Sequence, residues 1–436
     1  MIKIKLKVLK LNYFNNYKIL MNNLKYSNSV LINLITASII PFLIWGPFFP
    51  DLIVSISALF FLFYIFKNKA FHFFNNKPLI IFFIFCIYCI LLSIFIAKDT
   101  MSSLESSLFY FRIGVFSCFI WYLIDKDKTI LTYLYYAFVL CFLALVIDGY
   151  IQYFTGVNLT GFKIIGIRVS SFFGDELIVG SFLSRLFPLL FALFLVKNNQ
   201  KYEIYFIGFL FILVDVLIFM SGERGAFFFL NLSTVFIIIL IKKYQKFRLI
   251  TFIIGIICIF VLSLNSSKLS DRMFIGPAQD MGLIESSKEA VFFSPAHDSL
   301  IRTAYKMFKD QPLWGHGPKM FRVICKDEKY ATGISPCMTH PHNFYVQLLA
   351  ETGIIGFLFL FSILVYVIYT ALRQFKSIIF KQKRPLTDYQ VCLLAGILIT
   401  VWPLTTNGNF FNNWLMIVYS LPIGFYLQSI YSRKKD

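Results

Sequence analysis

The chain has 436 residues, of which 58% are hydrophobic and only 14% are charged, and its formal net charge is +19. A water-soluble protein cannot bury that share of apolar side chains, so the composition excludes a soluble globular protein and favours an integral membrane protein. The positive charge alone is compatible with nucleic acid binding, but its placement along the chain argues for another explanation.

Apolar runs long enough to cross a bilayer, about 20 residues each, recur along the whole chain. Backbone groups in hydrocarbon must be satisfied within the segment, so each run is predicted to be a helix. The basic N-terminus is not followed by a short apolar core with a small-residue cleavage site, so we expect the first span to serve as the insertion signal. The predicted spans lie at about 31–49, 51–66, 78–97, 107–124, 129–153, 176–196, 203–221, 224–242, 248–264, 343–372, 388–405 and 412–431.

The positive charges alternate between the two sides of these spans. Cytoplasmic loops carry an excess of Lys and Arg, so we place the N-terminus in the cytoplasm. Most of the 41 Lys and Arg then lie in the two terminal tails and in the loops near 67–77, 125–128, 197–201, 242–248 and 373–387. The pattern predicts an all-α polytopic membrane protein of about 12 transmembrane helices with both termini cytoplasmic. It also accounts for most of the net charge, so no nucleic acid partner is expected.

One connection is much longer than the others. The predicted organisation is therefore nine spans within 1–264, a large periplasmic loop at 265–342 containing short helices, and three spans within 343–436. Within the loop, 299–310 reads as an amphipathic helix that Asp298 or Ser299 caps and Pro312 ends. Its apolar face is predicted to carry Ile301, Ala304, Tyr305 and Phe308.

Two of the eight cysteines, Cys325 and Cys337, fall in this loop. A periplasmic location favours disulfide formation, so a bond between them is plausible. The other cysteines lie inside apolar runs, where a cysteine is usually a small buried hydrophobe.

Arginine is used relatively more often, compared with lysine, in the spans and external segments than on the cytoplasmic side. Its planar fork of donors suits phosphate and carboxylate groups better than an ammonium does. Arg224 lies in the external turn 221–226, where it can bind an anion or simply pair with Glu223. Arg302 lies on the predicted loop helix, where a solvated helix face is the alternative. Arg168 begins a further external loop at 168–176.

Two arginines, Arg112 and Arg185, fall within predicted spans. An ionisable side chain at membrane depth is costly unless it is paired or faces a polar cavity. Each can therefore line such a cavity or pair with Asp148 or Asp215.

Histidines gather where the large loop re-enters the membrane. His340 and His342 precede Asn343 there, and the chain has only five histidines. Histidine titrates near neutral pH and is a common general base. Gln347 and Glu351 then share one face of the entering helix, which is predicted to look into a cavity.

The segment 311–318 contains two glycines and two prolines and is predicted to form a tight loop. Its Trp314 can anchor at the membrane interface or stack on a sugar ring. His316 could complete a zinc site with His340 and His342, but no carboxylate or cysteine lies beside them with ligand spacing, so no metal is expected.

Together these motifs resemble the O-antigen ligase and O-antigen polymerase superfamily. The resemblance rests on the Arg-Gly pair at 224–225, on Arg302 with the segment 312–317, and on the run from His342-Asn343 to 351–356. The motif-bearing part covers about 165–360. The arrangement of about twelve spans with a large periplasmic loop before the tenth is similar to that of the ligases.

The resemblance implies a glycosyltransferase of the bacterial inner membrane that uses an undecaprenyl-diphosphate-linked glycan and requires neither a metal nor another cofactor. By resemblance, His342 is the base that activates the acceptor hydroxyl, and His340 is a second candidate. Arg224 and Arg302 would hold the diphosphate, although Glu223, directly before Arg224, departs from a simple anion site. Further candidates for binding the substrates are Arg168, Trp314, His316, Asn343 and Glu351.

Several functions fit this pattern. The leading hypothesis is an O-antigen ligase that joins the glycan to the lipid A core, and next is the polymerase of the same superfamily, which extends the growing glycan. A ligase that modifies protein is a third. From other classes, a transporter or lipid flippase predicts charged residues deep in several spans together with internal repeats. A non-catalytic assembly partner is the last.

Overall fold

The computed structural model describes residues 29–197, 200–284 and 293–432. The described residues form helices joined by loops, and their only extended pairings are two isolated bridges, between Val157 and Lys163 and between Ile165 and Arg168. This confirms the predicted all-α polytopic membrane fold. The N-terminal tail at 1–28 and the end of the C-terminal tail at 433–436, both predicted to be cytoplasmic, lie outside the described residues.

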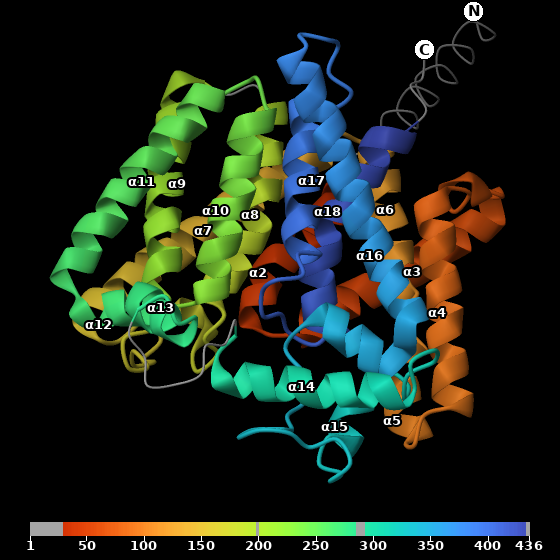
Figure 1. The fold of residues 1–436 in the computed structure, drawn as a ribbon. Helices are drawn as coiled ribbons and strands as arrows, with labels where there is room; N and C mark the ends of the chain where they lie inside the picture. The colour runs from red at the N-terminus through yellow and green to blue at the C-terminus, as the bar shows by residue number, and fades with distance from the viewer. Residues whose placement is uncertain (1–28, 198–199, 285–292, 433–436) are drawn as a thin grey trace, which may run out of the picture.

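The long helices pack side by side, and the short helices α12 to α15 gather at one end of the bundle, which we call the loop end (Figure 1). Residues 29–37 are helical and lead into the first named helix. The elements are α2 (Ile39–Trp45), α3 (Phe48–Asn68), η1 (Phe71–Phe73), α4 (Lys77–Phe95), α5 (Thr100–Ser107), α6 (Arg112–Lys126), α7 (Thr129–Thr155), η2 (Ser171–Phe173), α8 (Val179–Val196), α9 (Lys201–Met220), α10 (Arg224–Leu240), α11 (Gln245–Asn265), α12 (Ser267–Ser270), η3 (Asp271–Ile275), α13 (Gly276–Asp280), α14 (Pro295–Asp310), α15 (Phe321–Ile324), α16 (Phe344–Ile379), α17 (Asp388–Thr400) and α18 (Asn413–Tyr431).

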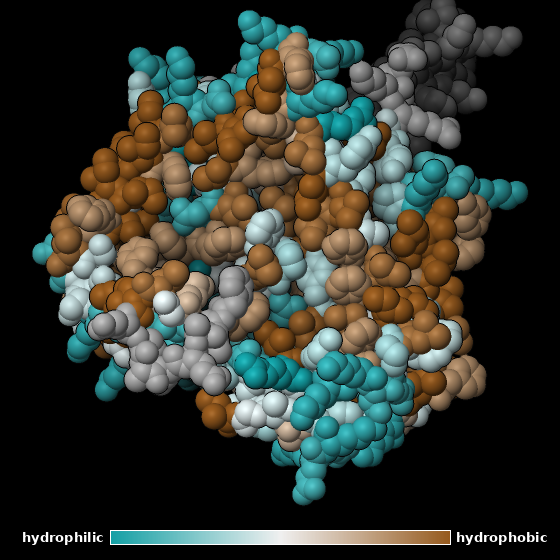
Figure 2. All heavy atoms as spheres, in the orientation of Figure 1, coloured by the Kyte–Doolittle hydropathy of each residue, from teal (hydrophilic) through white to brown (hydrophobic). Residues whose placement is uncertain are grey.

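Nine of the described helices are long and apolar enough to cross a membrane, and three shorter apolar helices lie at Ser29–Trp45, Arg224–Leu240 and Asp388–Thr400. Each predicted span overlaps one of these helices. Figure 2 shows hydrophobic side chains over the flanks of the bundle, with hydrophilic ones gathered at the loop end and at the opposite tips. The number of crossings and the orientation in the membrane remain predictions.

Helix α8 forms the centre of the bundle. Its residues are buried on every side, and it packs against α7, α9, α10 and α17. A helix that is hydrophobic all round needs such a position. Because α8 carries Arg185 within this core, its neighbours must satisfy a guanidinium at membrane depth.

The sequence left open whether Arg112 and Arg185 line a polar cavity or pair with Asp148 or Asp215, and the structure shows neither of these pairings. Arg112 binds Asp51 at the start of α3, with an N–O distance of 2.5 Å. Asp215 is occupied by Arg248 of α11 at 3.0 Å, and both side chains are buried. Asp148 instead accepts hydrogen bonds from the loop after α7. Arg112, Arg248, Asp148 and Asp215 therefore each have a polar partner, as the low dielectric of the interior requires.

The loop helix α14 differs in two ways from its prediction. It begins at Pro295, four residues earlier than expected, because a proline suits the first turn of a helix. Its buried face carries Leu300, Thr303, Ala304 and Met307, so Tyr305 is exposed rather than apolar and packed. The expected face was wrong by about one residue, because α14 packs against the start of α16.

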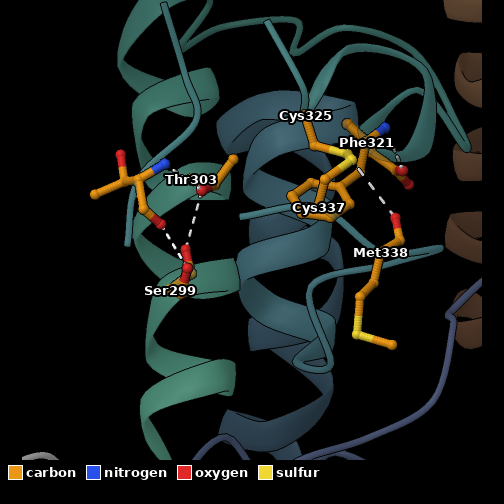
Figure 3. The surroundings of a disulfide bond; sticks show 8 residues. Ser299, Thr303, Phe321, Cys325, Cys337 and Met338 are labelled. Atoms are coloured by element: carbon orange, nitrogen blue, oxygen red, sulfur yellow. Dashed lines mark hydrogen bonds between the residues drawn. A yellow bond between two sulfur atoms is a disulfide. The ribbon is translucent and has the colours of Figure 1, made fainter. Parts of the chain in front are cut away.

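Cys325 and Cys337 form a disulfide beside α14 and α16, with their Cα atoms 5.1 Å apart (Figure 3). The bond joins the end of α15 to the strand-like segment that leads toward His340. Ser299 of α14 donates a hydrogen bond of 2.5 Å to the carbonyl of Thr332 in the same closed loop. The segment before the histidines is thus held against α14.

Candidate active site at the loop end

A break in α16 organises the loop end. Gly353 has φ 64° and ψ −164°, so the helix is interrupted and changes direction there (Figure 1). A side chain at this position would meet the backbone of Leu313, so the close approach requires glycine. The loop 311–317 fills the break with three backbone hydrogen bonds: His316 to Ala350 at 3.1 Å, Gly317 to Glu351 at 2.8 Å and Ile354 to Pro312 at 2.9 Å.

Through this packing, the loop 311–317 and the start of α16 form one structural unit. The break frees helix carbonyls that must find new donors. The first part of α16, residues 344–352, then lies across the loop end, and its N-terminus carries the histidines. Gly315 and Gly353, which allow the two backbones to approach closely, therefore build the platform of the site.

Asn343 starts α16 and fixes the residue before it. Its side-chain oxygen accepts hydrogen bonds from the N–H groups of Tyr345 and Val346, which makes it the N-cap, and its amide nitrogen donates to the carbonyl of Pro403 at 2.8 Å. His342 directly precedes it with φ 55°, a conformation that non-glycine residues rarely adopt. The N–H of Asn407 donates to the His342 carbonyl at 2.8 Å and helps to hold that conformation.

Three histidine rings meet at this point. The ring centre of His342 lies 4.0 Å from that of His340 and 5.0 Å from that of His297, which comes from α14. Nδ1 of His340 contacts the hydroxyl of Thr339, and its Nε2 is buried without a hydrogen-bond partner among the described residues. An unsatisfied buried ring nitrogen is costly and indicates a place for a polar ligand group.

The rings are held in their neutral form. Burial, together with the neighbouring His297, lowers the pKa of His342 to about 4. Burial and the nearby His342, Arg322 and His297 lower the pKa of His340 to about 3. Near neutral pH both rings can therefore accept a proton.

Gln347 and Glu351 were predicted to face a cavity, but the structure places them in a closed polar network. The Glu351 carboxylate accepts hydrogen bonds from Gln347 at 2.9 Å and from the N–H of Phe321 at 3.0 Å. Gln347 also donates to Asn409 at 2.8 Å. Both side chains are fully buried. Their role is to tie α15 and the loop after α17 to the platform that carries the histidines.

Three arginines surround the turn before α10. The Nε–H of Arg224 donates to the carbonyl of Arg272 at 2.7 Å, and the Nε–H of Arg272 donates to the carbonyl of Gly222 at 2.8 Å. Arg168 donates to the carbonyl of Ser221 at 3.1 Å. Burial and the charges of Arg168 and Arg224 lower the pKa of Arg272. We call Arg168, Arg224 and Arg272 the arginine cluster.

The arginine cluster lies next to the histidines. The positive charge of Arg224, after burial, lowers the pKa of His297, which in turn packs against His342. The N-terminus of α10 adds its unpaired N–H groups to the same side. Asp280 balances part of the charge, at 3.6 Å from Arg224. The cluster is thus suited to bind an anion beside the histidines.

Glu223 does not pair with Arg224. Its carboxylate is turned toward the start of α8 and accepts hydrogen bonds from the N–H of Gly180 at 2.7 Å and from the N–H and hydroxyl of Ser181. It therefore satisfies free donors of that helix terminus. This leaves the guanidinium of Arg224 free of its sequence neighbour.

Three predicted site residues make their contacts outside the histidine group. Arg302 is exposed and pairs with Asp298 on the same helix at 2.6 Å. Trp314 is half exposed and packs against Tyr88 in a tilted arrangement, with 6.3 Å between ring centres. Nε2 of His316 lies 3.0 Å from the carbonyl of Met307, and its ring is 5.6 Å from that of Tyr330. His316 therefore supports the loop and does not join the other histidines.

Sequence reasoning missed His297, Arg272 and Asn407. The first two lie in the large loop, and no spacing predicts that η3 and α14 return to the turn before α10. The scarcity of histidine was a usable signal for His297. Asn407 carries no motif, and only the structure links it to His342.

The described residues contain no group of three His, Cys, Asp or Glu that could hold a metal ion. His316 lies apart from His340 and His342, so the three do not form the zinc set considered from the sequence. That the protein requires no metal remains a prediction.

A comparison with protein families matches residues 207–361 to the family described as O-antigen ligase. The matched segment includes Arg224, Arg272 and the three clustered histidines. The match confirms the predicted resemblance to the O-antigen ligase and polymerase superfamily. It indicates a bacterial membrane enzyme of glycosyltransferase type, with a lipid-linked glycan and an acceptor as partners. A comparison with curated proteins finds no match.

Proposed function

We propose that this member of the O-antigen ligase and polymerase superfamily is a ligase, which transfers a glycan from undecaprenyl diphosphate to a hydroxyl of the lipid A core. The observation that carries the proposal is the pair of neutral, half-buried histidines beside the arginine cluster, within the segment that matches the family. In this proposal the loop end faces the periplasm and the protein lies in the bacterial inner membrane.

The reaction needs one base and one anion site. The acceptor hydroxyl attacks the anomeric carbon of the donor, a new glycosidic C–O bond forms, and the C–O bond to the diphosphate breaks. The hydroxyl proton passes to an imidazole, and the bond electrons leave with undecaprenyl diphosphate. No electron donor or acceptor is required.

His342 is the proposed base, because its strained backbone is fixed from two sides by Asn343 and Asn407. A positioned base contributes about 10²–10⁴-fold to such a reaction. His340, with its unsatisfied Nε2, is proposed to bind the acceptor hydroxyl or to share the proton.

Arg224 and Arg272 are the proposed contacts for the leaving diphosphate. Negative charge builds on that group in the transition state, and guanidinium groups that are held in position stabilise it. Arg168, which donates to two backbone carbonyls, holds the turn in place. Arg302 is assigned to the rim of the site, since its guanidinium is already paired.

The test is a lipopolysaccharide gel of a strain that lacks the gene, with wild-type or His342→Ala copies returned. The proposal predicts that the ladder of long glycans disappears, that glycan accumulates on undecaprenyl diphosphate, and that only the wild-type copy restores the ladder. A single repeat unit attached to the core would instead indicate the polymerase. An unchanged ladder would exclude both enzymes for this glycan.

A further inference from the structure

A groove of about 2180 Å³ runs along the side of the bundle between the helical segment 29–45 and α7. A pocket for a drug-sized ligand has about 300–1,000 Å³, so the groove is much larger than a site for one small molecule. At the end away from the loop end, Ser29 donates a hydrogen bond to Asp127 and Asn33 donates one to Thr129, which lines the groove. The walls along its length are apolar and include Leu34, Pro41, Tyr136, Leu140 and Ala144.

The loop end of the groove is polar. Lys319 and Arg322, which flank the start of α15, line it together with Asn409. Lys319 lies 3.6 Å from Glu105, whereas Arg322 has no hydrogen bond or ion pair within the described part of the chain. Glu105, Asp175 and Glu176 line the groove as well. The groove thus joins an apolar channel to a polar end at which Arg322 offers an unpaired guanidinium, and a guanidinium can bind the anionic head of an amphiphile.

Arg322, at the polar end of the groove, also lies near the histidines. The charge of Arg322 contributes to the lowered pKa of His340, whereas Arg224 acts on His297. Asn409, on the groove wall, binds Gln347 of the platform. Positive charge therefore reaches the histidine group from Arg322 as well as from the arginine cluster.

We infer that the groove binds the acyl chains of the acceptor, a phosphorylated glycolipid, and that Lys319 and Arg322 contact its phosphate. The inference rests on the proposed function, which needs two lipid-linked substrates to converge on one base. The arginine cluster, with three guanidinium groups, suits the more highly charged diphosphate of the donor. Arg322, with the apolar groove beside it, is then left for the acceptor.

The test measures binding of two probes, lipid A and undecaprenyl diphosphate, to the full-length protein in detergent. Arg322→Gln removes the cation, and Lys326→Gln is its control on an exposed neighbour. Ala144→Trp fills the groove, and Ile147→Trp is its control on a part of α7 outside the groove. Arg322→Gln and Ala144→Trp are expected to weaken lipid A binding by about tenfold or more and to leave undecaprenyl diphosphate binding unchanged. The two control variants should bind both probes as the wild type does.

Loss of undecaprenyl diphosphate binding instead would assign the groove to the donor and overturn the inference. Unchanged binding of both probes, or no binding of lipid A to the wild type, would also overturn it. Because binding is measured without turnover, the two proposals fail separately. A wild type that binds lipid A through the groove but transfers no glycan would remove the proposed function and leave the groove assignment standing.

Discussion

Arg185 of α8 donates a hydrogen bond of 2.6 Å to Oδ1 of Asn407, whose own N–H donates to the carbonyl of His342. The guanidinium is buried between the rings of Tyr419 and Phe229, at 4.1 and 4.5 Å from their centres, and also donates to the carbonyl of Ile399. A cation in the middle of the bundle thus anchors the loop that holds the candidate base. Asn407 is a positioning residue in this account.

Substitution of Asn407 by Ala should therefore affect turnover and not substrate binding. Without its anchor the loop shifts, and a small displacement of a catalytic group can lower kcat by about 10- to 100-fold. KM for both substrates should stay within twofold, about the scatter of such comparisons. Asn407→Asp, which keeps an acceptor for Arg185, should recover much of the rate. Asn68→Ala, on an exposed site at the other end of the bundle, is the control. A KM effect without a kcat effect would contradict the positioning role.

The pH dependence of kcat/KM tests the state of the histidines. A neutral imidazole is the active form, so activity is lost as pH falls through its pKa. Because the pKa of His342 is lowered to about 4, the rate should be flat between about pH 6 and 8, whereas an ordinary histidine would already lose half its activity near pH 6.5. His297→Gln removes a ring that lowers the pKa of His342 when it is protonated, so the pH at which activity is lost on the acid side should rise. A limb near 6.5 in the wild type would show that the base is more exposed than the structure indicates.

Substitutions in the arginine cluster should lower kcat more than substitution of Arg302. Arg224→Gln and Arg272→Gln should each lower kcat by about 10²–10³-fold, the usual cost of losing a transition-state donor. Arg302→Gln should stay within about threefold of the wild type, because an exposed ion pair contributes little. Arg373→Gln, on an exposed site of α16 far from the loop end, controls for loss of charge. If Arg302→Gln proved the most damaging of the three, the diphosphate would lie on α14 and not at the turn before α10.

The break in α16 should depend on Gly353. Gly353→Ala introduces a side chain at a positive φ and against the backbone of Leu313, and it should destabilise the protein by more than about 2 kcal/mol. Gly396→Ala is the control, since a side chain there meets only ordinary contacts. Thermal unfolding in detergent compares the two. Equal melting temperatures would mean that the loop 311–317 is not tightly packed into the helix.

Hydropathy predicted the helices well, because a lipid-exposed span must be apolar along its whole length and each was long enough to recognise. The position of His342 at the start of a helix also followed from local sequence, since Asn343 is a strong N-cap. The partners of the buried charges did not follow, because Arg112 and Arg248 find acids through helix packing that no spacing records. For the same reason the meeting of His297 with His342, and of Arg272 with Arg224, depends on how the large loop folds back.

The most direct test of the account is glycan transfer by the purified protein from an undecaprenyl-diphosphate-linked glycan to a lipid A core acceptor. Wild type, His342→Ala and His72→Ala are compared, because His72 is an exposed histidine outside the loop end and undergoes the same substitution. The account predicts that His342→Ala folds normally but turns over about 10²–10⁴-fold more slowly, whereas His72→Ala matches the wild type. A His342→Ala protein that transferred glycan at the wild-type rate would contradict the assignment of the base.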